Sequence, residues 1–342
     1  YISSSAFYGC KSLTDINVTE NNKYYSSSAG LLFDKNKTEL IKYPAGKSLK
    51  NFNIPNGVKS LDRYSFCNCS NLTSINIPES VTYIGIGAFY LCTNLKSIAI
   101  PDSVTKIENI TFTGCSSLTS ISIPESVTYI GLNAFKDCTS LTSIYIPDSV
   151  TLTGLSGTFS GCTSLTNVKL PDVIYIINTN TFAGCSSLLN IIIPDSVTSI
   201  KECAFEGCKS LTNIAIPESV TKIGTWAFKD CTSLKSIAIN NPDCEISNAK
   251  DTIPETAVIY GYKNSTAQTY AESFNRKFIS LEEIGDISGN GEIDLYDAIE
   301  IAKAIMGLRT FTAEEMIIAD FNMDGAVDLY DAIEIARTLL PK

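Results

Sequence analysis

Apolar residues recur in a fixed phrase along most of this chain, and CTSLTSIYIPDSVT is a typical copy. The same phrase follows nine cysteines: Cys10, Cys69, Cys92, Cys115, Cys138, Cys162, Cys185, Cys208 and Cys231. From Cys69 onward these cysteines are spaced 23 residues apart, with one step of 24. A period in this range is typical of solenoids, in which each unit stacks on its neighbours because it cannot bury its apolar face alone.

Within one repeat, the apolar positions predict a short strand followed by turns. Leu118, Ile121 and Ile123 follow an L-x-x-I-x-I pattern that points the apolar side chains of an extended segment inward, and Pro124 ends that segment. A second short segment then leads to Phe135, which fills the core behind it. The repeat is therefore predicted to be a strand-and-turn coil and not a pair of helices.

The repeat is interrupted once before it ends. Residues 20–50 depart from the period and predict an irregular hairpin with its turn at 35–37. The predicted solenoid covers residues 1–239, and residues 240–284 are expected to form a cap and a short linker, because the open end of a solenoid needs a polar cap. A separate domain is predicted from residue 285 to 342.

The spacing of the cysteines favours a buried ladder of reduced thiols over disulfides. Equivalent residues in neighbouring coils lie about 4.8 Å apart with parallel side chains, whereas a disulfide joins converging Cβ atoms about 3.8 Å apart. Free cysteine packs as a small hydrophobe, so the ladder is expected to fill the core. Cys67 and Cys69 are the one close pair, which makes a zinc site improbable, and Cys203 and Cys244 stay unassigned.

The last part of the chain contains a different duplication, GDISGNGEIDLYDAIEIAKAIMG followed by ADFNMDGAVDLYDAIEIARTLLP. In each copy, oxygen-bearing residues stand at positions 1, 3, 5, 7, 9 and 12 of a calcium-binding loop, position 7 acting through its carbonyl, with glycine at position 6 for the sharp turn. The predicted ligands are Asp286, Ser288, Asn290, Glu292, Asp294 and Asp297 in the first loop, and Asp320, Asn322, Asp324, Ala326, Asp328 and Asp331 in the second. The second loop has one carboxylate more, so we expect it to bind calcium more tightly.

Both parts of the chain resemble known families. The repeat phrase resembles the BspA-type bacterial leucine-rich repeat over about residues 1–240, which implies a curved parallel-sheet solenoid used in adhesion or protein contact. The tail resembles a type I dockerin over about residues 285–342, because position 12 is Asp and neither loop follows a convincing helix. The expected fold is an α+β leucine-rich-repeat solenoid followed by a small all-α, calcium-binding dockerin with two loop-helix motifs.

The dockerin resemblance implies two bound calcium ions, a cohesin module of a scaffold protein as partner, and a secreted component attached through the cohesin to a cellulosome or cell surface. In that family the residues at the end of each loop and on the following helix contact the cohesin. Here these residues are Leu295, Tyr296, Ile299 and Lys303 in the first copy, and Leu329, Tyr330, Ile333 and Arg337 in the second. The alternative for Leu295 and Leu329 is that they are buried in the helix core and do not contact the cohesin.

Composition excludes several classes of function. The net charge is -10, and residues 285–342 carry 12 acidic against 4 basic side chains, so the basic footprint that nucleic-acid binding needs is missing. The chain has no histidine, which removes histidine-dependent catalysis and histidine-ligated zinc. No apolar run approaches the roughly 20 residues of a membrane-spanning helix.

Three roles for the solenoid stay open. The first is a non-catalytic protein-binding or adhesion module, which uses exposed strand positions such as Tyr145 and an apolar strip from Ile192 to Ala238. The second is binding of plant cell-wall polysaccharide by aromatic side chains that recur every two coils or stand at a variable turn, namely Tyr83, Tyr129, Tyr175 and Trp226.

The third role, catalysis, has little support within the repeats. Their acidic residues all occupy the same turn position after Ile-Pro, where they are interpreted as turn formers: Glu79, Asp102, Glu125, Asp148, Asp172, Asp195 and Glu218. The chain opens at Tyr1 in the tail of a repeat, so an upstream polysaccharide-degrading domain, to which this part would be accessory, stays an alternative.

Overall fold

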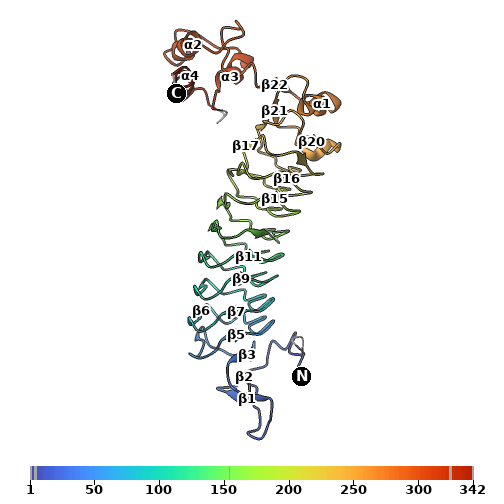
Figure 1. The fold of residues 1–342 in the computed structure, drawn as a ribbon, viewed down its shortest axis with the longest axis vertical. Coiled ribbons are helices and arrows are strands. Elements are labelled where there is room, and N and C mark those ends of the chain that lie inside the picture. The colour runs from blue at the N-terminus through green and yellow to red at the C-terminus, as the bar shows by residue number, and fades with distance from the viewer. Residues whose placement is uncertain (1, 4–5, 154, 323–325, 341–342) are drawn as a thin grey trace.

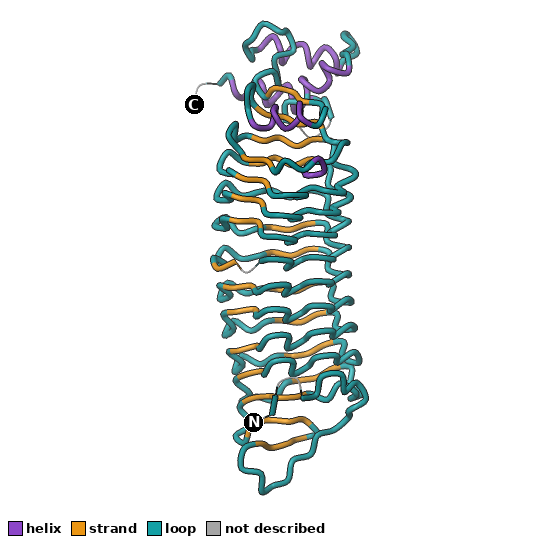
Figure 2. The backbone as a smooth tube through the Cα atoms, turned by 90° about the vertical axis from the view of Figure 1, so that its right-hand side faces the viewer, coloured by secondary structure: helices purple, strands orange, loops and turns teal. Residues whose placement is uncertain are grey.

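The structure is a computed structural model that describes residues 2–3, 6–153, 155–322 and 326–340. The chain winds into a long stack of coils and ends in a small group of helices (Figure 1). Strands run up two sides of the stack, and turns connect them along the third (Figure 2). The predicted leucine-rich-repeat solenoid with a helical C-terminal domain is confirmed.

The first side of the solenoid carries the strands formed by the Ser-Ile-x part of each repeat. They are β4 (Asn51–Asn53), β6 (Ser74–Asn76), β8 (Ser97–Ala99), β10 (Ser120–Ser122), β12 (Ser143–Tyr145), β14 (Asn167–Lys169), β17 (Asn213–Ile216), β19 (Ser236–Ile239), β21 (Val258–Gly261) and β22 (Phe278–Ser280). Neighbouring strands are parallel, and each residue pairs with its equivalent one repeat away, as Ile98 does with Ile75 and Ile121.

The second side carries shorter strands of the Thr-x-Ile part of the repeat. They are β5 (Ser60–Leu61), β7 (Tyr83–Ile84), β9 (Lys106–Ile107), β11 (Tyr129–Ile130), β13 (Leu152–Thr153), β15 (Ile176–Ile177), β16 (Ser199–Ile200), β18 (Lys222–Ile223) and β20 (Glu245–Ile246). These strands also pair in parallel and in register. Each of these strands points one Leu or Ile side chain inward wherever the structure describes the exposure. All of these side chains are buried except that of Ile246, which is half-buried.

The predicted hairpin at residues 20–50 is present but has one more strand than expected. β1 (Tyr25–Ser28), β2 (Leu31–Asp34) and β3 (Glu39–Lys42) are antiparallel neighbours. The tight turn between β1 and β2 consists of Ala29 and Gly30, both with positive φ, which matches the twist of a two-residue hairpin. β3 then pairs in parallel with β5, so the hairpin extends the second side of the solenoid.

A column of stacked phenylalanines fills the centre of the solenoid. Neighbouring rings lie 5.3–5.7 Å apart between centroids with planes within 21° of parallel. The column comprises Phe66, Phe89, Phe112, Phe135, Phe159, Phe182, Phe205 and Phe228, all fully buried. Offset stacking adds attraction beyond the burial of apolar area, so each coil is bound to the next mainly through this column.

Each coil reverses direction on the third side just before its central phenylalanine. The residue two positions earlier has a left-handed backbone with φ of 52–63°: Tyr64, Gly87, Ile110, Asn133, Gly157, Asn180, Cys203 and Trp226. We call this the left-handed position. Glycine adopts such a backbone without strain and asparagine at moderate cost, whereas a branched side chain such as that of Ile110 rarely does.

The cysteine ladder is buried and reduced from Cys69 onward, while Cys10 is exposed and does not take part. Each thiol from Cys92 to Cys231 donates a hydrogen bond to the carbonyl of the phenylalanine in the preceding coil, over 3.1–3.3 Å between sulfur and oxygen. That carbonyl also accepts from the N–H of the cysteine in its own coil, as Phe112 does from Cys115. The thiols are therefore cross-coil donors as well as core fillers.

The parallel ladder of the first side continues into the predicted cap. β21 pairs with β19, and β22 pairs with β21. η1 (Lys250–Thr252) and α1 (Thr266–Ser273) close the end of the core, with the Ser265 hydroxyl accepting from the N–H of Gln268 at the start of α1.

Two expectations for the first side were wrong. Residues 190–193 form no strand, so Ile192 is exposed on a coil segment between β14 and β17. Ala238 is buried, because the cap packs Tyr260 and Ile279 against it. The apolar strip expected from Ile192 to Ala238 is therefore covered at its C-terminal end.

The tail contains α2 (Leu295–Ile305), α3 (Ala313–Ala319) and α4 (Leu329–Thr338). α3 leads directly into the second loop, which corrects the expectation that neither loop follows a convincing helix. The physical reason is a capping box, in which the Thr312 hydroxyl accepts from the Glu315 N–H while the Glu315 carboxylate accepts from the Thr312 N–H. No helix within the described residues is long and apolar enough to cross a membrane.

Replacing one ring of the central column should destabilise the solenoid strongly. Phe135→Ala removes the contacts with Phe112 and Phe159 and leaves a cavity, which costs about 3–5 kcal/mol in the free energy of unfolding. Urea denaturation followed by circular dichroism measures the change. The surface variant Lys96→Ala is the control, and an equally small shift for both variants would contradict a core held by the phenylalanines.

The thiols should differ sharply in reactivity. Burial raises the pKa of Cys67 to about 11 and that of Cys162 to about 12, so both stay protonated and unreactive well above neutral pH. At pH 8, brief treatment of the folded protein with iodoacetamide is expected to modify Cys10 alone, and urea should expose the rest. Modified ladder cysteines in the folded protein, seen by mass spectrometry, would overturn the buried ladder.

Candidate functional site

The first predicted calcium loop is held in a tight turn by the carboxylate of Asp286. One oxygen of this carboxylate accepts from the Ser288 hydroxyl at 3.3 Å and from the Asn290 N–H at 3.0 Å. The other accepts from the Gly291 N–H at 2.8 Å. Gly291 has a φ of 87°, which explains glycine at the sixth position of the loop. Positions 1, 3 and 5 therefore face the inside of one turn.

Asp297 closes the first loop and starts α2 at the same time. Its fully buried carboxylate accepts from the Ser288 N–H at 2.9 Å and from the Asp294 N–H at 2.8 Å. Asp294 in turn caps α2 by accepting from the Tyr296 N–H. This reciprocal capping box ties the last loop ligand to the helix, so the loop and the start of α2 form one unit.

The middle of the first loop is cross-linked through an amide. The side chain of Asn290 donates to the Asp294 carboxylate at 3.3 Å and accepts from the Glu292 N–H at 2.8 Å. Glu292, whose carbonyl is the predicted seventh ligand, has an exposed side chain. The predicted ligands of this loop therefore lie on one compact turn.

The second loop repeats the closing geometry of the first. The fully buried carboxylate of Asp331 accepts from the Asn322 N–H at 3.1 Å and from the Asp328 N–H at 2.8 Å. Asp328 caps α4 by accepting from the Tyr330 N–H at 2.7 Å. Asp324 and Gly325 lie outside the described residues. The predicted ligands Asn322 and Ala326 flank the undescribed segment.

The donor set fits a calcium ion. Carboxylate, amide, hydroxyl and carbonyl oxygens at this spacing are the hard ligands that calcium prefers. The carboxylates are turned toward the backbone N–H groups of their own loops, and in the described part of the chain no three acidic or sulfur side chains converge closely enough to hold a metal ion. Each carboxylate has two oxygens with free lone pairs, so these side chains can accept from the backbone and ligate an ion at the same time.

The exposed side chains of α2 and α4 repeat in the two copies. Leu295 is 59% exposed and Leu329 is 57% exposed, so neither belongs to the helix core. That core contains Ile287, Ala298, Ile301, Ala319, Ala332 and Ile335. The other predicted contact residues with exposed side chains are Tyr296, Ile299, Tyr330 and Arg337, while Lys303 and Ile333 are half-buried.

The charged groups beside these two surfaces differ. Lys303 pairs with Glu300 at 2.6 Å and lies 5.7 Å above the ring of Tyr296. Arg309 links Glu300 to Glu315 at the start of α3, which places the first copy in an ion-pair network. Arg337 pairs with Glu334 alone among the described residues. The two copies therefore present equivalent apolar groups beside differently held cations.

The second calcium loop adjoins the end of the solenoid. Phe321, which follows the first ligand of this loop, packs against a cluster of Ala238, Tyr260, Ile279 and Ile284. Burial raises the pKa of Tyr260 to about 12, and the negative charge of Asp320 contributes to the rise. Sequence analysis missed this contact because no local pattern relates these distant residues.

The aromatic candidates of the solenoid do not form one surface. Tyr83 and Tyr129 lie on the second side, Tyr175 lies just before β15, and Trp226 occupies a left-handed position on the third side. The Tyr129 hydroxyl donates to the Asn109 side chain at 3.3 Å, and the ammonium of Lys229 lies 4.9 Å above the Trp226 ring.

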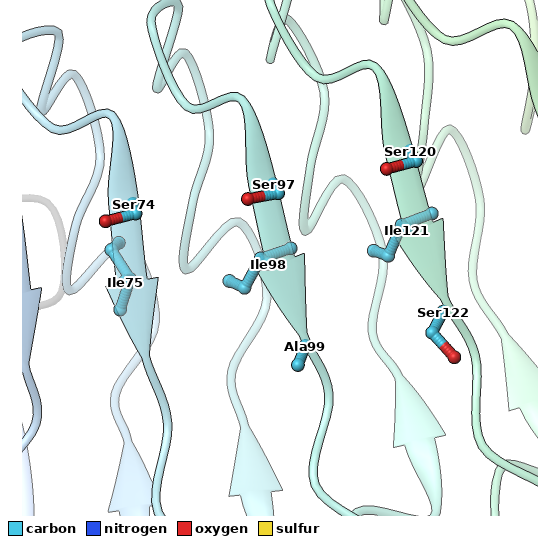
Figure 3. A pocket seen from close by; sticks show the side chains of 8 residues that line it. All are labelled: Ser74, Ile75, Ser97, Ile98, Ala99, Ser120, Ile121 and Ser122. Carbon is cyan, nitrogen blue, oxygen red and sulfur yellow. The ribbon is translucent and has the colours of Figure 1, made fainter.

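The first side is a row of small, uncharged side chains over much of its length. Figure 3 shows Ser74, Ser97 and Ser120 at equivalent places on neighbouring strands, with Ala99 and Ser122 beyond them. Tyr145, Lys169 and Ile192 interrupt this row farther along, and Ile192 is 87% exposed. The first side is therefore a smooth surface with a few apolar projections.

These features define a leucine-rich-repeat solenoid with a paired-loop calcium module. The BspA type leucine rich repeat model matches residues 1–46, 42–156 and 155–250, and the chain belongs to that family. The dockerin type I model matches residues 284–340, so the C-terminal domain is a dockerin. Type I dockerins bind calcium, and neither family is catalytic.

Solved structures support the solenoid. A leucine-rich repeat protein from Bacteroides ovatus is 28% identical, with 78% of this chain and 79% of that chain covered and a TM-score of 0.57. One from Eubacterium ventriosum is 34% identical with a TM-score of 0.51, over 58% of this chain and 54% of that one, so this chain spans about half of that relative. No curated protein matches the sequence.

Removing calcium should unfold the tail while the solenoid stays folded. Clustered carboxylates repel one another, and the small core of the dockerin offsets this only weakly. With EDTA, circular dichroism is expected to lose the helical signal of α2 and α4 and keep the strand signal. Full helical content in EDTA would contradict a calcium-dependent fold.

The loop-closing carboxylates provide a second measurement of the same site. Asp331→Asn removes a charged ligand from the second loop and Asp297→Asn one from the first, and each should weaken calcium binding to its own loop roughly tenfold or more. Calorimetric titration measures both affinities. The control Glu334→Gln lies on α4 outside the loop and should leave calcium binding unchanged.

Proposed function

We propose that this chain is a non-catalytic, secreted component of a cellulosome-like assembly. Its dockerin binds calcium in both loops and docks to a cohesin on a scaffold protein or cell surface. This docking places the solenoid on the scaffold or cell surface, where the solenoid acts as a protein-binding or adhesion module.

The single observation that best supports docking is the exposure of the same apolar pair in both copies. Leu295 with Tyr296, and Leu329 with Tyr330, stand at the start of a helix directly after a calcium loop, and all are more than half exposed. Exposed leucine and tyrosine at fixed positions are the kind of groups that carry binding energy at protein interfaces. Their duplication supports docking through either copy.

Calcium acts on this surface through the helix starts. When bound, the ion supplies the positive charge that neutralises the clustered carboxylates of its loop. The predicted ligands of the first loop are Asp286, Ser288, Asn290, Asp294 and Asp297, with the carbonyl of Glu292. The corresponding oxygens of the second loop hold the other ion. Because Asp297 and Asp331 are also helix caps, ordering a loop orients the leucine and tyrosine that follow.

The solenoid surface supports a protein partner better than a polysaccharide. Over β6, β8 and β10 its first side offers an uncharged row on which a partner can lie without losing bound counterions. Tyr145 and Ile192 project from that row as apolar contacts. The tyrosines of the polysaccharide alternative stand two coils apart on the second side, with Lys106 between Tyr83 and Tyr129. They do not form a continuous aromatic platform.

Cohesin titration with paired variants tests the docking proposal. Leu295→Ala with Tyr296→Ala, or Leu329→Ala with Tyr330→Ala, should weaken calcium-dependent binding less than about fivefold, because the other copy substitutes. The four changes together remove both anchors and should weaken binding roughly hundredfold or more. Leu132→Ala, an exposed leucine of the solenoid, is the control. Binding by the fourfold variant with unchanged affinity, measured by calorimetry, would refute docking through these residues.

A further inference from the structure

The third side of the solenoid has a cavity of about 460 Å³ near its N-terminal end that neither docking nor the first side uses. Two outward positions of successive coils line it. Tyr64, Ile110 and Asn133 occupy left-handed positions, and Tyr90, Thr113 and Lys136 each directly follow the central phenylalanine of a coil, while Tyr8 comes from the N-terminal segment before the hairpin. The residues that line the cavity therefore come from several coils, and the first and last of them, Tyr8 and Lys136, are more than a hundred residues apart in the sequence.

Aromatic rings form one wall of this cavity. Tyr64 lies 6.4 Å from Tyr8 and 6.3 Å from Tyr90 between ring centroids, with interplanar angles of 80° and 90°. The rings thus meet as a corner and do not stack into a closed block. Gly87 makes this arrangement possible, because a Cβ there would lie 2.5 Å from a ring carbon of Tyr64. Tyr8 is 58% exposed, so much of its ring is free to contact a ligand.

The polar groups of the cavity suit a ligand with hydroxyls and a negative charge. Burial and the neighbouring Tyr8 hydroxyl raise the pKa of Tyr90, so its phenol stays a hydrogen-bond donor even at alkaline pH. Asn133 also lines the cavity and carries an amide. Lys136 is the one charged side chain that lines the cavity, and the described part of the chain gives its ammonium no ion pair.

We propose that this cavity binds a saccharide unit bearing a carboxylate, such as a uronic acid residue within an acidic glycan. The sugar ring packs against the corner formed by Tyr8, Tyr64 and Tyr90, as apolar faces of pyranose rings do on aromatic side chains. Its carboxylate pairs with Lys136, and its hydroxyls bond to Asn133 and to the Tyr90 phenol. This site is independent of the proposed cohesin docking and of the tyrosines on the second side.

Calorimetric titration of the full, calcium-loaded chain with oligogalacturonate and with a neutral cello-oligosaccharide tests the proposal. Oligogalacturonate is expected to bind at least tenfold more tightly than the neutral sugar, and its affinity should fall with salt. Lys136→Gln should weaken the binding of oligogalacturonate at least tenfold and abolish the preference for it over the neutral sugar. Tyr8→Ala, which changes an exposed side chain, should weaken binding at least fivefold.

Two matched variants serve as controls. Lys229→Gln changes the lysine that occupies the position of Lys136 in a distant coil, and Tyr175→Ala removes an exposed tyrosine of the second side. Both should bind oligogalacturonate as the unchanged protein does. The proposal is overturned if neither sugar binds, if Lys136→Gln keeps full affinity, or if Tyr175→Ala loses as much as Tyr8→Ala. Circular dichroism of the same samples confirms that the solenoid is folded, and cohesin titration reports on docking separately.

Discussion

Stacking of each central phenylalanine on its equivalent in the next coil is the contact on which the rest of the solenoid depends. The rings from Phe66 to Phe228 form one buried column, and the carbonyls beside them accept from the cysteine thiols of the following coil. A coil cannot bury its phenylalanine without a neighbour, so stability is shared between adjacent units and the stack behaves as a one-dimensional assembly. Because the column sets the same spacing on all sides, outward side chains from distant repeats come to lie at regular positions.

The dockerin is stabilised in a different way. Its apolar core is small, and its loops are organised by carboxylates that accept from backbone N–H groups and cap the helices. Calcium affinity, helix formation and the exposed leucine-tyrosine pairs are therefore linked through Asp297 and Asp331. Phe321 joins this module to the end of the solenoid, so the second loop lies against the repeat array as well as beside its own helix. Under the proposed function, the two parts of the chain combine a repeat surface with a calcium-dependent attachment.

Much of the architecture was predictable because its determinants are local or repeat at fixed spacing. The strands, the inward Ile and Leu positions and the hairpin near residue 35 followed from patterns within single repeats, whereas the two ligand sets stay predictions. Other features were missed. The capping box that starts α3 at Thr312 was present in the sequence and overlooked. The thiol hydrogen bonds and the burial of Ala238 left no such signal, because their partners lie a repeat or more away.

The sequence by itself determined that the chain forms a stack of strand-and-turn coils followed by a domain with two duplicated loop-helix motifs, since periodicity and motif spacing are properties of neighbouring residues. Only the tertiary structure decided which side chains meet across coils. Tyr8 lies beside Tyr64 although an irregular hairpin separates them in the chain, and Phe321 packs against the cluster of Ala238, Tyr260, Ile279 and Ile284 although these residues are far from it in the sequence. Such contacts join residues that are far apart in the sequence, and the packing of the whole stack decides which of these residues meet.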